Sequence, residues 1–124
     1  MKILAIDYGE KRIGLAVGDS GSKIAFSRGI IQNSAHVYEE LKKFCVKESI
    51  EKIIVGLPLS LSGEDSEQTK GTRVFAERLH QEIGAPVEFI DERLTSVQAQ
   101  KLHPEKEHID DLAAALLLEQ YFRS

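Results

Sequence analysis

Two short, uninterrupted apolar runs constrain the fold of this 124-residue chain more than any other feature. The first is "ILAI" at residues 3–6, and the second is "IIVGL" at residues 53–57. A continuous run of this length is typical of a strand that is covered on both faces. Residues 34–49, which lie between the runs, have helical spacing, and a helical crossover joins parallel strands. The sequence therefore predicts two parallel, central strands.

The segments around these runs complete the predicted sheet. Gly9 allows a tight turn after the first run, and residues 13–19, "IGLAVGD", then return as an antiparallel strand that contains Gly14. Residues 24–31 predict a third strand, and residues 86–90 predict a fifth. We therefore expect an α/β fold with a mixed five-stranded sheet in the order 3-2-1-4-5, an antiparallel second strand and flanking helices.

The spacing of apolar residues also predicts the helices that cover this sheet. Ser, Thr and Asn are favoured at helix starts, and Gly is favoured just after helix ends. The predicted helices cover residues 34–49, capped by Asn33 or Ser34; residues from Thr69 or Thr72 to Ile83, ending at Gly84; residues 95–102, opened by the capping box "TSVQ"; and the apolar segment 109–122, "IDDLAAALLLEQYF".

The length and composition fit a single globular domain over residues 1–124. The only cysteine, Cys45, excludes an internal disulfide. The longest uncharged apolar stretch, residues 112–118, is far too short for a membrane span, so a cytoplasmic location without a membrane partner is expected. The net charge of −4 gives no overall basic surface, so a polyanionic partner would need local positive groups.

Carboxylates occur where the predicted parallel strands end. Asp7 ends the first strand, Asp91 and Glu92 follow the fifth, and Asp110 opens the last helix. Ligands of open α/β sheets bind outside the carboxyl ends of parallel strands, so we expect these groups to converge. Hard oxygen ligands without clustered His or Cys favour Mg²⁺ or Mn²⁺ over zinc. Such a site is suited to phosphodiester hydrolysis.

Each carboxylate also has a structural interpretation, which the sequence alone leaves open. Asp7 could start an Asx-type turn. Glu92 could form an ion pair with Arg12 or Arg93, and Asp110 or Asp111 could stabilise the positive end of the helix dipole. The metal-site hypothesis therefore depends on the joint occurrence of the carboxylates rather than on any one of them.

Side chains that could bind phosphate lie close to the same strand ends in the sequence. Arg12 and Arg93 carry guanidinium groups that can bind phosphate oxygens bidentately, and Thr95 and Ser96 stand at a predicted helix N-terminus. Further candidate cations are Lys11, Lys70 and Arg73. A nucleic acid is therefore the expected partner, although Tyr8 is the only candidate near the site for stacking a base.

Four segments resemble successive motifs of the YqgF family, also called RuvX: "DYGEKRIGLAVGD", "IVGLPLSLSG", "DERLTS" and "DDLAAALLLEQYF". The resemblance spans nearly the whole chain. It implies an RNase H-like fold and a metal-dependent nuclease whose catalytic, metal-binding carboxylates are Asp7, Glu92 and Asp110. The flanking motif positions are Gly9, Arg12, Gly14, Arg93, Thr95 and Ser96.

The resemblance also implies substrates. The family is described as a nuclease that matures the 5′ end of pre-16S rRNA, and it was first proposed to be a Holliday junction resolvase. Pre-16S rRNA, presented on ribosomal particles, and structured DNA are thus the expected partners of a monomer or weak homodimer. Relatives usually carry a longer basic segment where this chain has "KLHPEKEH", which argues against strong affinity for a four-way junction.

Two other functions compete with the nuclease hypothesis. The segment "IDYGEKRIGLAVGD" also resembles the first phosphate loop of actin-like ATPases and sugar kinases, but those enzymes close two such domains around a nucleotide. A non-catalytic RNA-binding or assembly module is the other alternative, because the chain is not basic overall.

Overall fold

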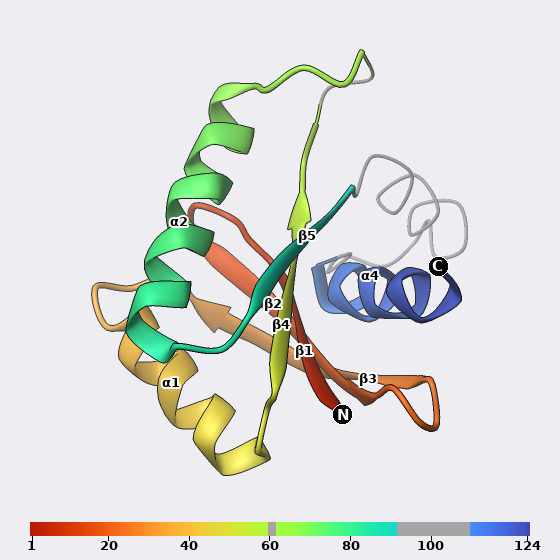
Figure 1. Cartoon of the computed structure of the whole chain (residues 1–124). Coiled ribbons are helices and arrows are strands. Elements are labelled where there is room, and N and C mark those ends of the chain that lie inside the picture. The colour runs from red at the N-terminus through yellow and green to blue at the C-terminus, as the bar shows by residue number, and fades with distance from the viewer. Residues whose placement is uncertain (60–61, 92–109) are drawn as a thin grey trace.

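The structure is a computed structural model that describes residues 1–59, 62–91 and 110–124. Figure 1 shows the course of the chain. Its elements are β1 (Lys2–Asp7), β2 (Arg12–Asp19), β3 (Ile24–Gln32), α1 (Val37–Glu48), β4 (Lys52–Leu57), α2 (Glu67–Ile83), β5 (Val87–Asp91) and α4 (Asp110–Arg123).

The sheet has five strands in the order β3-β2-β1-β4-β5, which confirms the predicted order. β2 pairs antiparallel with both β1 and β3, and β4 pairs parallel with both β1 and β5. β1 is therefore the central strand. Ile3, Leu4, Ala5 and Ile6 are all buried, as the continuous apolar run predicted.

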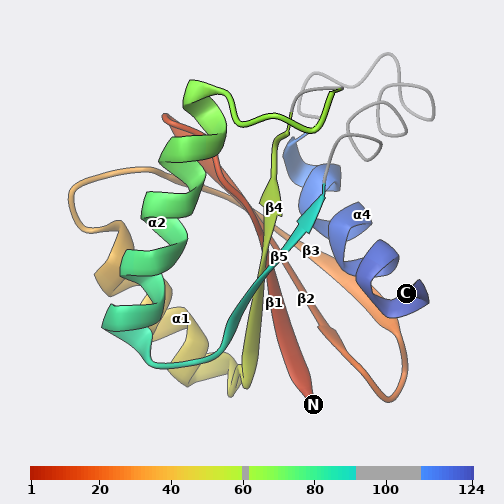
Figure 2. The ribbon, with the colours of Figure 1, turned by 45° about the horizontal axis from the view of Figure 1, so that its top comes forward.

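Helices cover both faces of the sheet. α1 and α2 lie on one face, and α4 crosses the other (Figures 1 and 2). Leu4 and Ile6 of β1 belong to the core cluster that includes Leu41 of α1, whereas Ile3 and Ala5 pack in the cluster that includes Leu118 of α4. Successive strand residues point to opposite faces, so one strand supplies both cores.

The two helices on the first face, α1 and α2, begin at other residues than the sequence patterns predicted. α1 begins at Val37, and its N-cap, His36, makes no capping hydrogen bond through its side chain. Asn33 and Ser34 are therefore not caps: the Asn33 side chain donates instead to the Gly9 carbonyl oxygen, and the Ser34 hydroxyl accepts from the His36 N–H. Long-range and local turn contacts have taken the place of the expected cap.

α2 begins earlier than the expected Thr69 or Thr72. Its N-cap is Ser66, whose hydroxyl accepts from the Thr69 N–H while the Thr69 side chain bonds back to the Ser66 backbone. Threonine in the third helical position performs the role that Glu or Gln has in the usual capping box. The predicted helix end is confirmed, because Gly84 adopts a left-handed conformation with φ of 86°.

α4 packs closely on the sheet because small residues lie beneath it. A Cβ atom on Gly18 would lie 3.0 Å from side-chain atoms of Leu118 and Phe122, and 2.5 Å from the Ile24 carbonyl oxygen. Ala5 and Ala16 supply further small side chains in the same cluster. None of the helices in the described ranges is both long and apolar enough to span a membrane.

The last turn of α4 is fixed to the amino end of β4. The Lys52 ammonium donates to the Tyr121 hydroxyl at 2.6 Å and pairs with the Glu88 carboxylate of β5 at 2.8 Å. These two hydrogen bonds, first that to Glu88, raise the pKa of Lys52. Lys52 of β4 thereby connects β4 and β5 to α4.

β3 is an edge strand with an irregular ladder. Its pairing with β2 shifts register between Gly14 and Ala16, and Gly29 adopts a positive φ of 83°. Ile24 and Phe26 are 53% and 61% exposed, respectively. The start of β3 therefore exposes two large apolar side chains in the described structure.

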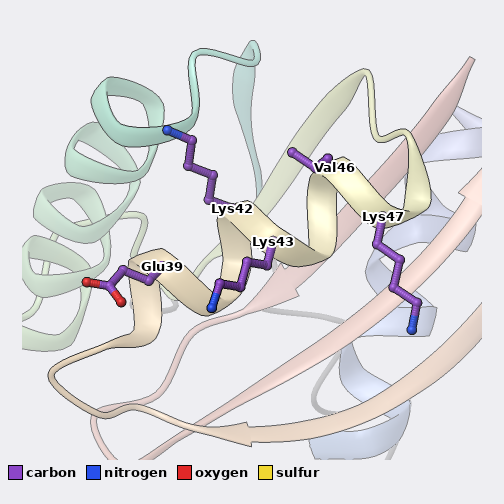
Figure 3. A pocket seen from close by; sticks show the side chains of 5 residues that line it. All are labelled: Glu39, Lys42, Lys43, Val46 and Lys47. Atoms are coloured by element: carbon purple, nitrogen blue, oxygen red, sulfur yellow. The ribbon is translucent and has the colours of Figure 1, made fainter.

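The outward surface of α1 carries basic and acidic groups. Lys42, Lys43 and Lys47 extend from it around the exposed side chain of Val46, and Glu39 lies on the same surface (Figure 3). This surface faces away from the sheet, on the side opposite α4. It is therefore separate from the strand ends at which the carboxylates were predicted to converge.

Candidate active site

The carboxyl ends of β1, β4 and β5 lie at one edge of the sheet (Figure 2). Asp7 is the last residue of β1 and is half-buried opposite Gly14 of β2. Asp91 is the last residue of β5 and pairs with Leu57, the last residue of β4. α4 begins at Asp110 near the ends of β4 and β5. Segments that are distant in the sequence thus meet at this edge.

The alternation of β1 determines the face on which Asp7 lies. Ile3 and Ala5 face α4, so Asp7, two residues further along the regular strand, lies on that face as well. Arg12 starts β2 and shares a face with Ala16, which also packs in the α4 cluster. The first motif therefore carries a carboxylate and an exposed guanidinium on the same side of the sheet.

The turn between Asp7 and Arg12 is tight, and hydrogen bonds from Asn33, before α1, hold it in place. A Cβ atom on Gly9 would lie 2.5 Å from the Arg12 carbonyl oxygen, so only glycine fits the turn as it stands. Asn33 donates from its side-chain amide to the Gly9 carbonyl oxygen at 2.9 Å and from its backbone to the Lys11 carbonyl oxygen at 2.9 Å. These two bonds bracket the turn.

Tyr8 anchors the same turn on the other face. Its ring lies 4.4 Å, centroid to centroid, from that of Phe75 of α2, and the Tyr38 ring of α1 lies 5.6 Å from Phe75 on the same measure. Aromatic pairs at these distances are stabilising. Tyr8 is therefore partly buried and packs against α2 at the border of the core.

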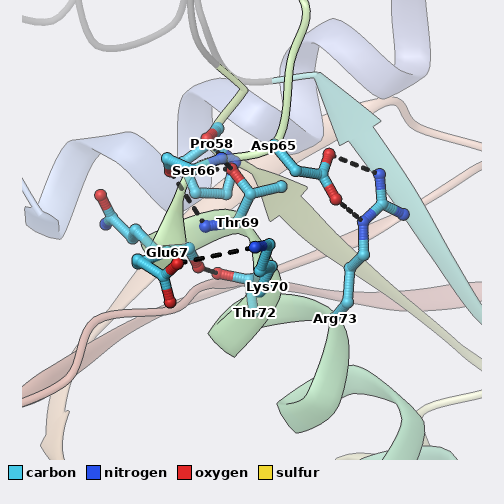
Figure 4. Close-up of polar contacts among 9 residues, drawn as sticks. Pro58, Asp65, Ser66, Glu67, Thr69, Lys70, Thr72 and Arg73 are labelled. Atoms are coloured by element: carbon cyan, nitrogen blue, oxygen red, sulfur yellow. Dashed lines mark hydrogen bonds and ion pairs between the residues drawn. The ribbon is translucent and has the colours of Figure 1, made fainter.

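The end of β4 is fixed by a buried polar contact (Figure 4). The Thr69 hydroxyl, which is fully buried, donates to the Pro58 carbonyl oxygen at 2.6 Å and accepts from the Ser66 N–H at 3.1 Å. The α2 capping box therefore also holds the chain where it leaves the sheet. The sequence showed Thr69 only as a possible helix start, because its partner Pro58 is remote in the sequence.

Two of the predicted cations are paired with acidic side chains. The Arg73 guanidinium donates to both oxygens of Asp65, at 2.9 and 3.2 Å (Figure 4), and Lys70 lies 3.5 Å from the Glu67 carboxylate. The two hydrogen bonds from Arg73 hold the pKa of Asp65 below its ordinary value. Arg12 and Lys11 are exposed, and within the described ranges no acidic group forms an ion pair with Arg12.

The remaining predicted site residues lie mainly outside the described part of the chain. Glu92, Arg93, Thr95, Ser96 and the helix expected over residues 95–102 belong to the segment 92–109. Asp110 is described only as the first residue of α4. Within the described residues, no three His, Cys, Asp or Glu side chains form a metal-binding group. Asp7, Gly9, Arg12 and Gly14 are the predicted residues that the structure describes in full.

A family model described as "RuvX: Holliday junction resolvase" matches residues 1–124. The chain belongs to the RuvX family. Two curated relatives are each named "Putative pre-16S rRNA nuclease". That of Maridesulfovibrio salexigens is 35% identical over 131 residues, with 98% of this chain and 97% of the relative covered. That of a Sulfurihydrogenibium species is 39% identical over 128 residues, with 97% and 88% covered.

Solved structures show the fold that this RuvX chain shares. "T. thermophilus RuvC in complex with Holliday junction substrate" matches with a TM-score of 0.65 at 15% identity, covering 98% of this chain and 93% of that one. The predicted RNase H-like fold is thus confirmed. "Crystal Structure of ROK Hexokinase from Thermus thermophilus" matches with a TM-score of 0.51 at 20% identity, and this chain covers 38% of it. The likeness to a sugar kinase is therefore confined to one part of that larger protein.

Proposed function

We propose that the chain is a metal-dependent nuclease that hydrolyses phosphodiester bonds during 5′-end processing of pre-16S rRNA. Its catalytic, metal-binding residues are Asp7, Glu92 and Asp110. The observation that carries this proposal is the position of Asp7, at the end of the central strand and on the face that α4 covers. Membership of the RuvX family and the names of the relatives support the same activity.

The chemistry of the donors fits Mg²⁺ or Mn²⁺. Carboxylate oxygens are hard ligands, which these ions prefer. Among the residues that the structure describes, two softer candidates lie away from this edge: Cys45 is buried in α1, and the His80 ring bonds to the Ala85 carbonyl oxygen before β5. A bound ion of this kind would activate water and offset negative charge at the phosphate.

The residues around the carboxylates bind and orient the substrate. Arg12, exposed at the start of β2 and on the same face as Asp7, binds a phosphate of the RNA. Arg93, Thr95 and Ser96 supply further phosphate contacts beside Glu92. Gly9 and Gly14 form the turn and strand that carry Asp7; Gly14 pairs directly opposite it.

The physiological setting follows from this activity. Residues 1–124 act as a single nuclease domain, as a monomer or weak homodimer. The partner is pre-16S rRNA presented on ribosomal particles in the cytoplasm. Because the chain has a net charge of −4, its own charge does not favour binding to RNA, and contacts with a particle would assist that binding.

Incubation of the purified protein with a pre-16S rRNA fragment, with Mg²⁺ or Mn²⁺ and with EDTA, tests the proposal. We expect cleavage that requires the metal and that Asp7→Asn reduces by at least ~100-fold, because a ligand oxygen and its charge are lost. Glu10→Gln is the matched control: it removes an equal charge from an exposed carboxylate in the same turn. Wild-type protein without metal-dependent cleavage of any nucleic acid would overturn the proposal.

A Holliday junction resolvase is the second candidate, because the description of the matching family model names that activity. The same assay with a four-way DNA junction separates the two functions. Metal-dependent cleavage of the junction but not of the rRNA fragment would favour the resolvase. RNA binding without cleavage would favour an assembly module, and transfer of the γ-phosphoryl group of ATP to a sugar hydroxyl, with release of ADP, would favour a kinase.

A further inference from the structure

A groove runs between α2 and the edge strand β5, on the face opposite α4. We call it the β5 groove; it is lined by Arg73, Ala76, Glu77, His80, Pro86, Val87 and Phe89. It encloses about 490 Å³, a size common among pockets for small molecules. The residues of the proposed active site do not line it.

Two flat side chains are held against each other at one end of the groove. Phe89 is 42% exposed, and the Arg73 guanidinium carbon lies 5.6 Å from the centre of its ring. The double hydrogen bond to Asp65 fixes the guanidinium in turn. An aromatic ring and a guanidinium plane are the groups on which unstacked RNA bases stack. Because Asp65 already holds the guanidinium, little further ordering of Arg73 would accompany stacking.

The charges of the groove favour a base over a phosphate. The charge of Arg73 is paired with that of Asp65, and Glu77 contributes another carboxylate. His80 Nδ1 lies 2.9 Å from the Ala85 carbonyl oxygen, which can only accept, so Nδ1 donates this hydrogen bond. Carboxylates repel a phosphate but can accept from the amino group of a base.

The groove is also close to the proposed catalytic edge. Phe89 precedes Asp91 by two positions on β5, a distance of about 7 Å along a strand. Asp91 ends the strand beside the end of β4, and Glu92 comes next in the sequence. Asp7 lies on the α4 face and the groove on the opposite face, so a single strand that leaves the catalytic edge would reach the groove by passing around the edge strand β5.

We propose that the β5 groove binds one unpaired base of the RNA, stacked on Phe89, and so positions a single-stranded segment next to the cleavage site. The proposal rests on the proposed nuclease function and names the form of RNA that the enzyme takes. Base stacking on an aromatic side chain tolerates different bases, so the groove selects single-stranded structure rather than sequence.

A single-stranded oligoribonucleotide that contains 2-aminopurine tests the proposal, in EDTA so that no cleavage occurs. Stacking on Phe89 should quench the 2-aminopurine fluorescence. Phe89→Ala and Phe89→Leu should each weaken binding by ~10-fold, whereas Phe89→Tyr should restore it, because only the aromatic variant keeps a stacking face. Phe89→Leu retains apolar packing, so a loss that it shares with Phe89→Ala is not an effect of unfolding.

Phe26→Ala is the matched control. Phe26 is also an exposed phenylalanine on an edge strand, but it lies on β3 at the other side of the sheet. We expect this variant to bind like wild type. An abasic oligonucleotide of the same length should bind wild type and Phe89→Ala equally, because its phosphates remain and its bases do not.

Equal binding of the 2-aminopurine oligonucleotide by wild type and Phe89→Ala would overturn the groove proposal. The groove proposal would also be overturned if the groove bound an extended peptide more tightly than the oligonucleotide, as detected by chemical-shift changes along β5. Neither result depends on cleavage. If the rRNA assay fails but Phe89 still stacks a base, only the nuclease proposal fails; if cleavage is observed and stacking is not, only the groove proposal fails.

Discussion

The side-chain amide of Asn33 donates to the carbonyl oxygen of Gly9 across 2.9 Å, which ties the chain before α1 to the turn after Asp7. The backbone N–H of Asn33 reaches the Lys11 carbonyl oxygen in the same turn. The conformation of this turn sets the positions of both Asp7 and Arg12. The hydrogen bonds that hold this turn come from Asn33, which the sequence pattern had predicted as a possible helix cap.

Asn33→Ala should reduce kcat for RNA cleavage by ~10-fold with little change in KM, because Asp7 is held less rigidly while phosphate contacts remain. The loss of one hydrogen bond should lower the free energy of unfolding by about 1 kcal/mol. Ser34→Ala, which removes a local bond to His36 in the same loop, is the control. An unchanged kcat in Asn33→Ala would show that the turn holds its shape without this bond.

Gly9→Ala should disrupt the turn itself. The added Cβ atom would lie 2.5 Å from the Arg12 carbonyl oxygen, so the backbone must move. We expect a loss of about 1–3 kcal/mol in the free energy of unfolding, together with a fall in cleavage. Gly71→Ala is the matched control, because nothing lies within 4 Å of its Cβ position in α2; it should stabilise the fold by about 0.5–1 kcal/mol. Equal stabilities would contradict the geometry.

Thr69→Val should destabilise the protein although it preserves shape. The Pro58 carbonyl oxygen and the Ser66 N–H lose their partner, and Thr69 is fully buried. Unpaired polar groups of this kind cost about 1–3 kcal/mol. Urea unfolding measures the change. Thr69→Ser keeps the hydroxyl and should recover part of the loss; a valine variant as stable as the serine variant would show that the hydroxyl contributes little.

Acid should weaken the contact between Asp65 and Arg73. The pKa of Asp65 is lowered from its ordinary 3.8, mainly by the hydrogen bonds from Arg73. The ion pair therefore contributes stability above that value and loses it as the pH falls through the lowered pKa. Asp65→Asn should unfold more readily than wild type at about pH 7, and the difference should shrink towards about pH 3. A difference that stays constant with pH would exclude this ion pair as its source.

Cys45 should be unreactive in the folded protein. Burial raises the pKa of its thiol to about 11, and 5% of the residue is exposed. Thiol reagents react with the thiolate, so labelling at neutral pH should be slow and should become fast in urea. Rapid labelling under native conditions, measured by mass spectrometry, would indicate that α1 opens locally.

Patterns that depend on local physics predicted most of the fold. The apolar runs of β1 and β4 placed these strands at the centre of the sheet, because only strands covered on both faces lack alternation. Gly84 marked the end of α2, since a left-handed residue favours glycine. Helix starts were predicted less well, because Asn33 and Thr69 bond to carbonyl groups of distant segments.

The candidate site was predicted only in part for a similar reason. Asp7 and Arg12 could be found because each adjoins a strand with a clear pattern. The β5 groove could not, because it depends on the approach of α2 to β5, and Arg73 appeared in the sequence as a free cation. The structure describes where Asp7 and Arg12 lie, but their proposed roles stay predictions, as do those of Glu92, Arg93, Thr95, Ser96 and Asp110.

The irregular ladder of β3 has a consequence for the behaviour of the protein at high concentration. A long, flat edge strand with exposed apolar side chains can pair with another molecule and start aggregation. The register shift opposite Gly14 and Ala16, together with the positive φ of Gly29, interrupts the hydrogen-bonding edge next to Ile24 and Phe26. Bulges twist an edge away from a second strand. We therefore expect this irregular pairing to disfavour the addition of a second molecule at β3, and a variant with a regular β3 ladder to aggregate more readily.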